Sequence, residues 1–132
     1  MRNTEPVYRH NTADKIGVIV ANLGTPDAPT TSAVRRYLKE FLSDQRVVEI
    51  PKALWWVILN GIILRTRPKK SAAAYRTIWD TEQNDSPLRL TTKAQAAKLQ
   101  EQLNWFAQGK YVVTTGMRYG NPSMKDAVRE LK

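Results

Sequence analysis

Residues 16–26 read IGVIVANLGTP and residues 111–122 read YVVTTGMRYGNP, and these two stretches decide the fold. Each starts as an apolar, β-branched run and breaks into a turn with glycine and proline that leads into a helical pattern. Runs that are apolar throughout are typical of parallel strands covered on both faces, with the intervening helical sequence as the crossover. Ligands of open parallel sheets bind outside the carboxyl ends of the strands. We therefore expect function at residues 23–26 and 118–121.

Helical patterns occupy most of the sequence between the two strands. Thr30 or Thr31 is a suitable N-cap for a helix to residue 42, and Ser86 followed by Pro87 is a second N-cap signature. Prolines are also expected to open two further helices, over residues 51–64 and 68–79. In the helix after Pro87, the apolar stripe is expected to comprise Ala96, Leu99, Leu103 and Phe106.

The 132 residues have the size of one small domain, yet two strands are fewer than a stable parallel sheet usually contains. A last helical pattern begins at Pro122 and stops without a C-cap or a further strand. We interpret residues 15–132 as an incomplete α/β lobe with a doubly wound, parallel sheet, preceded by a loose arm over residues 1–14. The alternative is a complete small protein.

Composition limits the environment of the chain. There is no cysteine, which excludes disulfides and thiolate metal sites in this segment and fits a reducing compartment. The first 15 residues are polar and lack the apolar core of a signal peptide, so a cytoplasmic location is expected. The longest apolar stretch, residues 54–64, is shorter than the roughly 20 residues that cross a bilayer.

The net charge is +9, from 21 basic and 12 acidic side chains. No acid occurs between Glu49 and Asp80, a segment that contains Arg65, Arg67, Lys69, Lys70 and Arg76. Such a block fits nucleic acid, anionic lipid or an anionic small molecule. Equally, it is what a solvated helix face shows when its acidic partners lie elsewhere.

Two adjacent tryptophans, Trp55 and Trp56, precede this basic block. On a helix they point about 100° apart, so one core cannot readily bury both. Exposed apolar surface beside arginines suits a flat hydrophobic ligand with acidic substituents, or a membrane interface. Packing against another part of the protein is the alternative.

Arg118 and Tyr119 lie where the second strand ends, and we expect them either to face a ligand or to fix the turn. The sequence supplies no general base, complete metal site or phosphate loop, and its single histidine, His10, falls in the polar arm. Any proton-handling residues are therefore expected elsewhere.

Five motifs in order resemble the N-terminal part of a bacterial ferrochelatase, a class II chelatase. They are NLGTPDAP at 22–29, VRRYLKEFLSD at 34–44, RPKKSAAAY at 67–75, SPL at 86–88 and MRYGNP at 117–122. The resemblance implies two Rossmann-like lobes, of which this chain is most of the first. It also implies a lyase that inserts ferrous iron into protoporphyrin IX, the last step of haem synthesis, with no cofactor in this segment.

Carried over by motif, the resemblance implies that Leu23 and Phe41 line the porphyrin mouth, with Trp55 and Ile58 in its lip. It further implies that the propionates are bound by Arg65 or Arg67, with Tyr75 and Ser86, and that Arg118 and Tyr119 lie deep in the cleft on the side where the metal approaches. The family's catalytic histidine and glutamate belong to the second lobe, so no catalytic or metal-ligating residue is expected in this chain, and the isolated chain is expected to be inactive.

Two alternatives remain at this point. A related chelatase for coproporphyrin or a cobalt-accepting ring has nearly the same chemistry. A basic nucleic-acid-binding module fits the charge, but it should interleave aromatics with lysine and arginine on one exposed face, whereas Tyr75 and Trp79 fall on an apolar stripe. We therefore expect a tetrapyrrole, ferrous iron and the second lobe as partners, with peripheral contact to the inner membrane and without nucleic acid.

Overall fold

The computed structural model describes residues 13–132, so all but two residues of the expected N-terminal arm lie outside the described part. Two parallel strands, β1 (Ile16–Thr25) and β2 (Tyr111–Gly120), form one sheet in which Ile16 pairs with Tyr111 and Thr25 with Gly120. Both strands are longer than the apolar runs that predicted them. The α/β class and the parallel pairing are confirmed, consistent with part of a Rossmann-like lobe.

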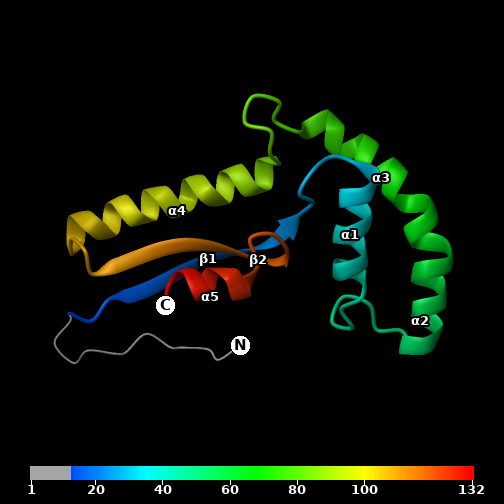
Figure 1. The fold of residues 1–132 in the computed structure, drawn as a ribbon, viewed down its shortest axis with the longest axis horizontal. Coiled ribbons are helices and arrows are strands. Elements are labelled where there is room, and N and C mark those ends of the chain that lie inside the picture. The colour runs from blue at the N-terminus through cyan, green and yellow to red at the C-terminus, as the bar shows by residue number, and fades with distance from the viewer. Residues whose placement is uncertain (1–12) are drawn as a thin grey trace, which may run out of the picture.

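Helices α4 (Pro87–Phe106) and α5 (Met124–Glu130) cover opposite faces of the strand pair (Figure 1). On one face, Asn22 of β1 donates to Thr92 of α4 over 3.1 Å. On the other, a Cβ on Gly116 of β2 would lie 2.7 Å from the sulfur of Met124 and 3.2 Å from the Cβ of Ala127, both on α5, so glycine leaves room for the close approach of this helix. Cover is incomplete within the described residues, because Ile16 and Val112 stay exposed, whereas the apolar runs predicted burial throughout.

The remaining helices form a second group beside the carboxyl ends of the strands (Figure 1). Helix α1 (Thr31–Leu42) packs against α3 (Leu64–Ile78), and α2 (Lys52–Ile58) continues into α3 through a π-helical turn, η1 (Leu59–Ile63). The Thr30 hydroxyl caps α1 by accepting from the amide of Ala33, and the Ser86 hydroxyl caps α4 by accepting from Arg89, as predicted.

The predicted helix start at Pro68 is wrong. Pro68 lies inside α3, and the chain is helical without interruption from Lys52 to Ile78. Proline lacks the N–H that would bond the carbonyl four residues earlier, which is that of Leu64. That carbonyl accepts instead from Nε of Arg35 on α1 over 3.0 Å, which allows the helix to continue.

The expected buried stripe of α4 is also partly wrong. Ala96 is buried, but Leu99 is partly exposed and Phe106 is 80 % exposed. The residues buried on this helix are instead Arg89, Thr92 and Ala96, because polar side chains here bond the strands and the loops that follow them. None of the described helices is long and apolar enough to cross a membrane.

Candidate functional site

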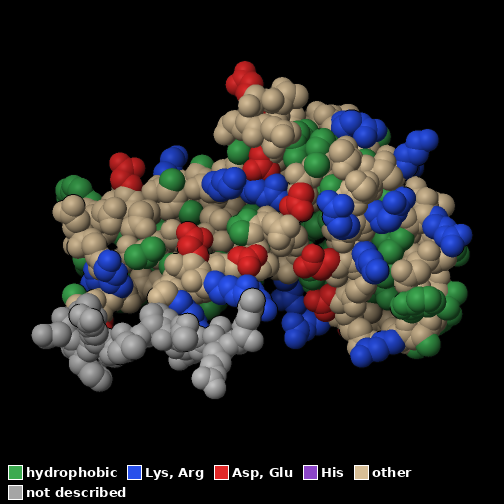
Figure 2. All heavy atoms as spheres, viewed as in Figure 1, with side chains coloured by type: hydrophobic (Ala, Val, Ile, Leu, Met, Phe, Trp, Pro, Cys, Tyr) green, Lys and Arg blue, Asp and Glu red, His purple; other side chains and the backbone are tan. Residues whose placement is uncertain are grey.

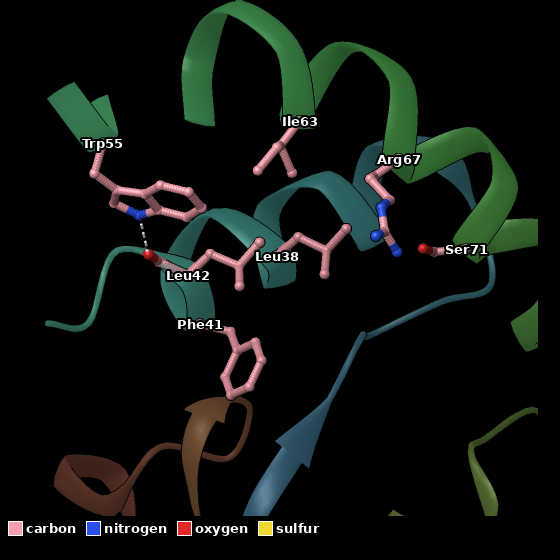
Figure 3. A pocket seen from close by; sticks show the side chains of 7 residues that line it. All are labelled: Leu38, Phe41, Leu42, Trp55, Ile63, Arg67 and Ser71. Atoms are coloured by element: carbon pink, nitrogen blue, oxygen red, sulfur yellow. Dashed lines mark hydrogen bonds between the residues drawn. The ribbon is translucent and has the colours of Figure 1, made fainter. Parts of the chain in front are cut away.

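A cavity of about 310 Å³ lies between α1 and the α2–α3 helix (Figure 3). We call it the α1–α3 cavity. Its lining residues are Leu38, Phe41, Leu42, Trp55, Ile63, Arg67 and Ser71. The lining is apolar except at one end, where Arg67 and Ser71 face each other on successive turns of α3 (Figure 3). Its size is at the lower limit for a small-molecule site, and its chemistry suits the edge of a flat apolar ligand with an anionic group.

Trp55 forms the wall of this cavity nearest α2. Its indole N–H donates to the carbonyl oxygen of Leu42 over 2.6 Å, which fixes the ring at the carboxyl end of α1 (Figure 3). The same ring borders a second hollow of about 210 Å³, which is also lined by Trp56 and Ile50. Trp56 is 67 % exposed, which confirms that the adjacent tryptophans are not both buried.

Phe41 connects the cavity to the ends of the strands. Its ring stacks on Tyr37 with centroids 6.0 Å apart and meets Tyr119 of β2 edge to face at 5.1 Å. Tyr37 is buried, and its hydroxyl donates a hydrogen bond to the carbonyl of Gly24. Burial is the main cause that raises the pKa of Tyr37 to about 12, and the nearby Tyr75 contributes to the same shift. An aromatic row therefore runs from β1 to the cavity.

The structure separates the two candidate arginines. Arg67 lines the α1–α3 cavity, whereas Arg65 lines a different hollow of about 420 Å³ together with Arg35, Arg36 and Lys39 of α1. We call this hollow, which is lined by Arg65, Arg35, Arg36 and Lys39, the basic hollow. In Figure 2, Lys and Arg side chains gather over the part of the molecule built from α1, α2 and α3. Of the two arginines, only Arg67 lines the cavity that also contains Phe41 and Trp55.

Four other residues expected at the site lie outside the lining of this cavity. Ile58 is half-buried on α2, and Tyr75 is half-buried on α3 one turn beyond Ser71, with burial raising its pKa. Ser86 is buried and uses its hydroxyl as the cap of α4. Leu23 is exposed at the carboxyl end of β1.

Leu23 and Arg118 occupy matching positions at the same edge of the sheet, as predicted. The flanking residues of Leu23, Asn22 and Gly24, pair with Met117 and Tyr119, which flank Arg118. Tyr119 is buried, whereas 47 % of the Arg118 side chain is exposed. Both are hydrogen-bonded to Asp44, which follows α1.

Arg89 and Asp44 were missed by sequence reasoning. The buried guanidinium of Arg89 pairs with Asp85 and donates to the carbonyls of Pro26 and Asn121, at 3.4 and 3.1 Å, so it joins the loops that follow β1 and β2. Burial opposes ionisation of Asp85, but the hydrogen bonds from Arg89 and Ser86 outweigh it and lower the pKa of that carboxyl.

No cluster of three or more metal-ligating side chains occurs within residues 13–132.

Comparison with known proteins agrees with this architecture. The sequence profile of the ferrochelatase family matches residues 15–132. The chain belongs to the ferrochelatase family. It is 54 % identical over 129 residues to a ferrochelatase of Chromobacterium violaceum, an alignment that covers 98 % of this chain and 35 % of that protein.

Other ferrochelatases show the same extent of similarity. The protein of Marinobacter nauticus is 52 % identical over 125 residues, covering 95 % of this chain and 33 % of the relative. That of Dechloromonas aromatica is 54 % identical over 129 residues, covering 97 % and 34 %. The chain thus spans about a third of the length of these ferrochelatases. The resemblance read from the five motifs is confirmed, and the nucleic-acid-binding alternative is not favoured.

Proposed function

We propose that this chain is the N-terminal part of an enzyme that inserts ferrous iron into protoporphyrin IX to form haem, a lyase reaction that ends haem biosynthesis. Family membership supports the reaction, and one structural observation carries the substrate: the apolar α1–α3 cavity has a single arginine at its polar end. Protoporphyrin IX is a flat apolar ring with two propionates, so both halves of this lining have a counterpart on the substrate.

In this proposal Phe41 and Trp55 contact the face or edge of the ring, and Arg67 holds a propionate through charge-assisted hydrogen bonds. Ser71 is a second donor beside Arg67. The cavity is small for a whole porphyrin, so the ring also needs surface outside it, and Ile58 at the lip and Leu23 at the strand ends are candidates for that surface. Arg65, Tyr75 and Ser86 do not line the cavity, so in this proposal they contact only parts of the porphyrin that extend beyond it.

Metal insertion removes two pyrrole protons, which requires bases close to the ring. We assign this role to a histidine and a glutamate of a second lobe outside this chain, and we place Arg118 and Tyr119 on the side where iron approaches. The isolated chain is accordingly expected to be inactive. Ferrous iron and the porphyrin are substrates in this scheme, and no cofactor is assigned to this segment.

We further propose a cytoplasmic protein with peripheral contact to the inner membrane. The exposed apolar side chains Leu54, Trp56, Val57 and Ile62 lie on α2 and η1, and the basic hollow is lined by residues of α1 and by Arg65. Tryptophan favours the interfacial region, and arginine and lysine are attracted to anionic lipid.

The test compares Arg67→Ala with Arg65→Ala in the complete enzyme. Quenching of protein fluorescence measures the affinity for porphyrin. This affinity should fall about 10-fold or more in Arg67→Ala, as expected for loss of one charge-assisted contact. Arg65→Ala should bind nearly as the unchanged protein does. Equal affinity in both variants would contradict the assignment of the cavity, and failure of the unchanged protein to insert iron would contradict the proposed reaction.

A further inference from the structure

Asp44 joins the end of α1 to the end of β2, although the partners are 74 and 75 residues apart in the chain. Its Oδ2 accepts the hydroxyl proton of Tyr119 over 2.6 Å and a hydrogen bond from Nη2 of Arg118 over 3.2 Å. Its other oxygen, Oδ1, accepts from the backbone N–H of Arg46 over 2.9 Å. Both carboxylate oxygens are therefore engaged, and the side chain has a defined orientation.

These contacts close into a ring of three side chains. The Tyr119 hydroxyl gives its only proton to Asp44 and accepts from Nε of Arg118 over 3.1 Å. Tyr119 is thus left without a proton to donate to a ligand. Arg118 retains Nη1, for which the described residues provide no acceptor, and this end of the group is open to solvent.

The charges in this ring cancel. Arg118 and Asp44 contribute one positive and one negative charge, and their ion pair spans 3.2 Å. The neighbouring aromatic residues, Tyr119 and Phe41, are neutral, and Phe41 lies one helical turn before Asp44 and also lines the α1–α3 cavity. The ends of β1 and β2 therefore present an oriented guanidinium whose charge is balanced by Asp44. The Glu40 carboxylate, which accepts from the backbone N–H of Gly120 over 3.1 Å, adds a further negative charge beside it. A dication meets less repulsion there than it would from an unpaired guanidinium.

We propose that Asp44 is a positioning residue for iron entry: its carboxylate orients Arg118 and neutralises it, so that a divalent cation can approach the ends of β1 and β2. This inference rests on the proposed function, since it assumes that ferrous iron enters on the side of Arg118. It adds a residue and a role that the cavity alone does not require.

The test is steady-state iron insertion by the complete enzyme, measured anaerobically with ferrous iron and protoporphyrin IX varied separately. Asp44→Asn removes the negative charge and keeps the size, so the KM for iron should rise roughly five-fold at low ionic strength, as Coulomb repulsion in a high-dielectric cleft predicts. The KM for porphyrin should stay within two-fold. Added inert salt should reduce the effect on iron, because it screens exposed charges.

Arg118→Met gives the opposite change of charge and should lower the KM for iron, whatever it does to kcat. The double variant, Asp44→Asn with Arg118→Met, should return the KM for iron toward that of the unchanged enzyme. Asp126→Asn is the matched control, because the Asp126 carboxylate also accepts a hydrogen bond from a nearby hydroxyl, but it bonds Ser123 in the capping box of α5 and not Arg118 or Tyr119.

An unchanged KM for iron in Asp44→Asn, or a rise that salt does not reduce, would overturn the inference while leaving the proposed function intact. If Asp44→Asn does not fold, the sign of the change in Arg118→Met decides: a raised KM for iron overturns the inference. If the unchanged enzyme binds porphyrin but inserts no iron, the proposed function fails first.

Discussion

Arg35 donates its Nε hydrogen to the carbonyl oxygen of Leu64, which is the acceptor that Pro68 leaves without a regular helical partner. Leu64 is buried, so water does not readily replace this bond. A side chain of α1 thereby completes the backbone bonding of α3. The same contact ties α3 to α1, the two helices between which the α1–α3 cavity lies.

Arg35→Met should therefore lower the free energy of unfolding by about 1–3 kcal/mol, the usual cost of leaving a buried acceptor unpaired. Pro68→Ala restores an N–H at the required position, so the same Arg35 substitution should cost clearly less in that background. Urea unfolding of the four proteins in this double-mutant cycle measures the difference. An equal cost in both backgrounds would show that Arg35 does not act through this carbonyl.

Gly24 should be intolerant of any side chain. Its φ is +126°, and a Cβ would lie 1.8 Å from the carbonyl oxygen of Tyr119. Gly24→Ala should cost more than about 2 kcal/mol in thermal or urea unfolding, because strain and a backbone clash combine. Gly109 has a φ of +76° with open space around it, so Gly109→Ala isolates the conformational term and should cost only about 1–2 kcal/mol. Similar losses in the two variants would argue against a close approach of the strand ends.

Arg89 should be the most sensitive polar residue of the sheet edge. Replacing it by Met leaves Asp85 buried without its main partner and releases the carbonyls of Pro26 and Asn121. We expect a loss of about 3–5 kcal/mol, as for other broken buried ion pairs. Lys93→Met is the control, since Lys93 pairs with the same carboxylate from an exposed position and should cost at most about 1 kcal/mol. Urea unfolding measures both losses of stability. Similar values in the two variants would contradict a special role for Arg89.

The elements that the sequence predicted well are those determined by near neighbours. The strand runs, the Thr30 and Ser86 caps and the exposure of one of the two adjacent tryptophans all follow from residues within a few positions of one another. Arg89 and Asp44 escaped because the partners that tie them to the strand ends lie 32 to 75 residues away, and no local pattern reveals these contacts. Pro68 was misread for the same reason, since its compensation comes from Arg35 on another helix.

The candidate site divides in the same way. Motif resemblance selected Phe41, Trp55 and Arg118, but spacing did not choose between Arg65 and Arg67. That choice depends on the rotation of α3, which is fixed by the π-helical turn at η1 and by packing against α1. Ser71 carried no signal of its own, because a serine among alanines on a helix looks like surface.

Asp44 should make stability depend on pH in the acid range. Hydrogen bonds from Tyr119, from the backbone of Arg46 and from Arg118 hold the pKa of this carboxyl at about 2. Because the folded pKa is depressed, the stabilisation is complete above the unfolded pKa, near 3.9, and is lost as the pH falls toward 2. Urea midpoints of the unchanged protein and Asp44→Asn should therefore differ at pH 5 and converge by about pH 2. A difference that persists undiminished would show that ionisation of Asp44 is not its source.

The adjacent tryptophans should respond to substitution in opposite ways. Trp55→Ala removes a cavity wall and the bond to the carbonyl of Leu42, so it should lower the free energy of unfolding by about 3 kcal/mol and weaken porphyrin binding. Trp56→Ser removes an exposed side chain and should change stability by less than about 0.5 kcal/mol, while reducing sedimentation with vesicles of anionic lipid. Thermal unfolding, fluorescence quenching and vesicle sedimentation separate these outcomes. If Trp56→Ser destabilises the protein as much as Trp55→Ala does, the indole of Trp56 packs against another part of the complete enzyme, and the membrane contact proposed for this surface is wrong.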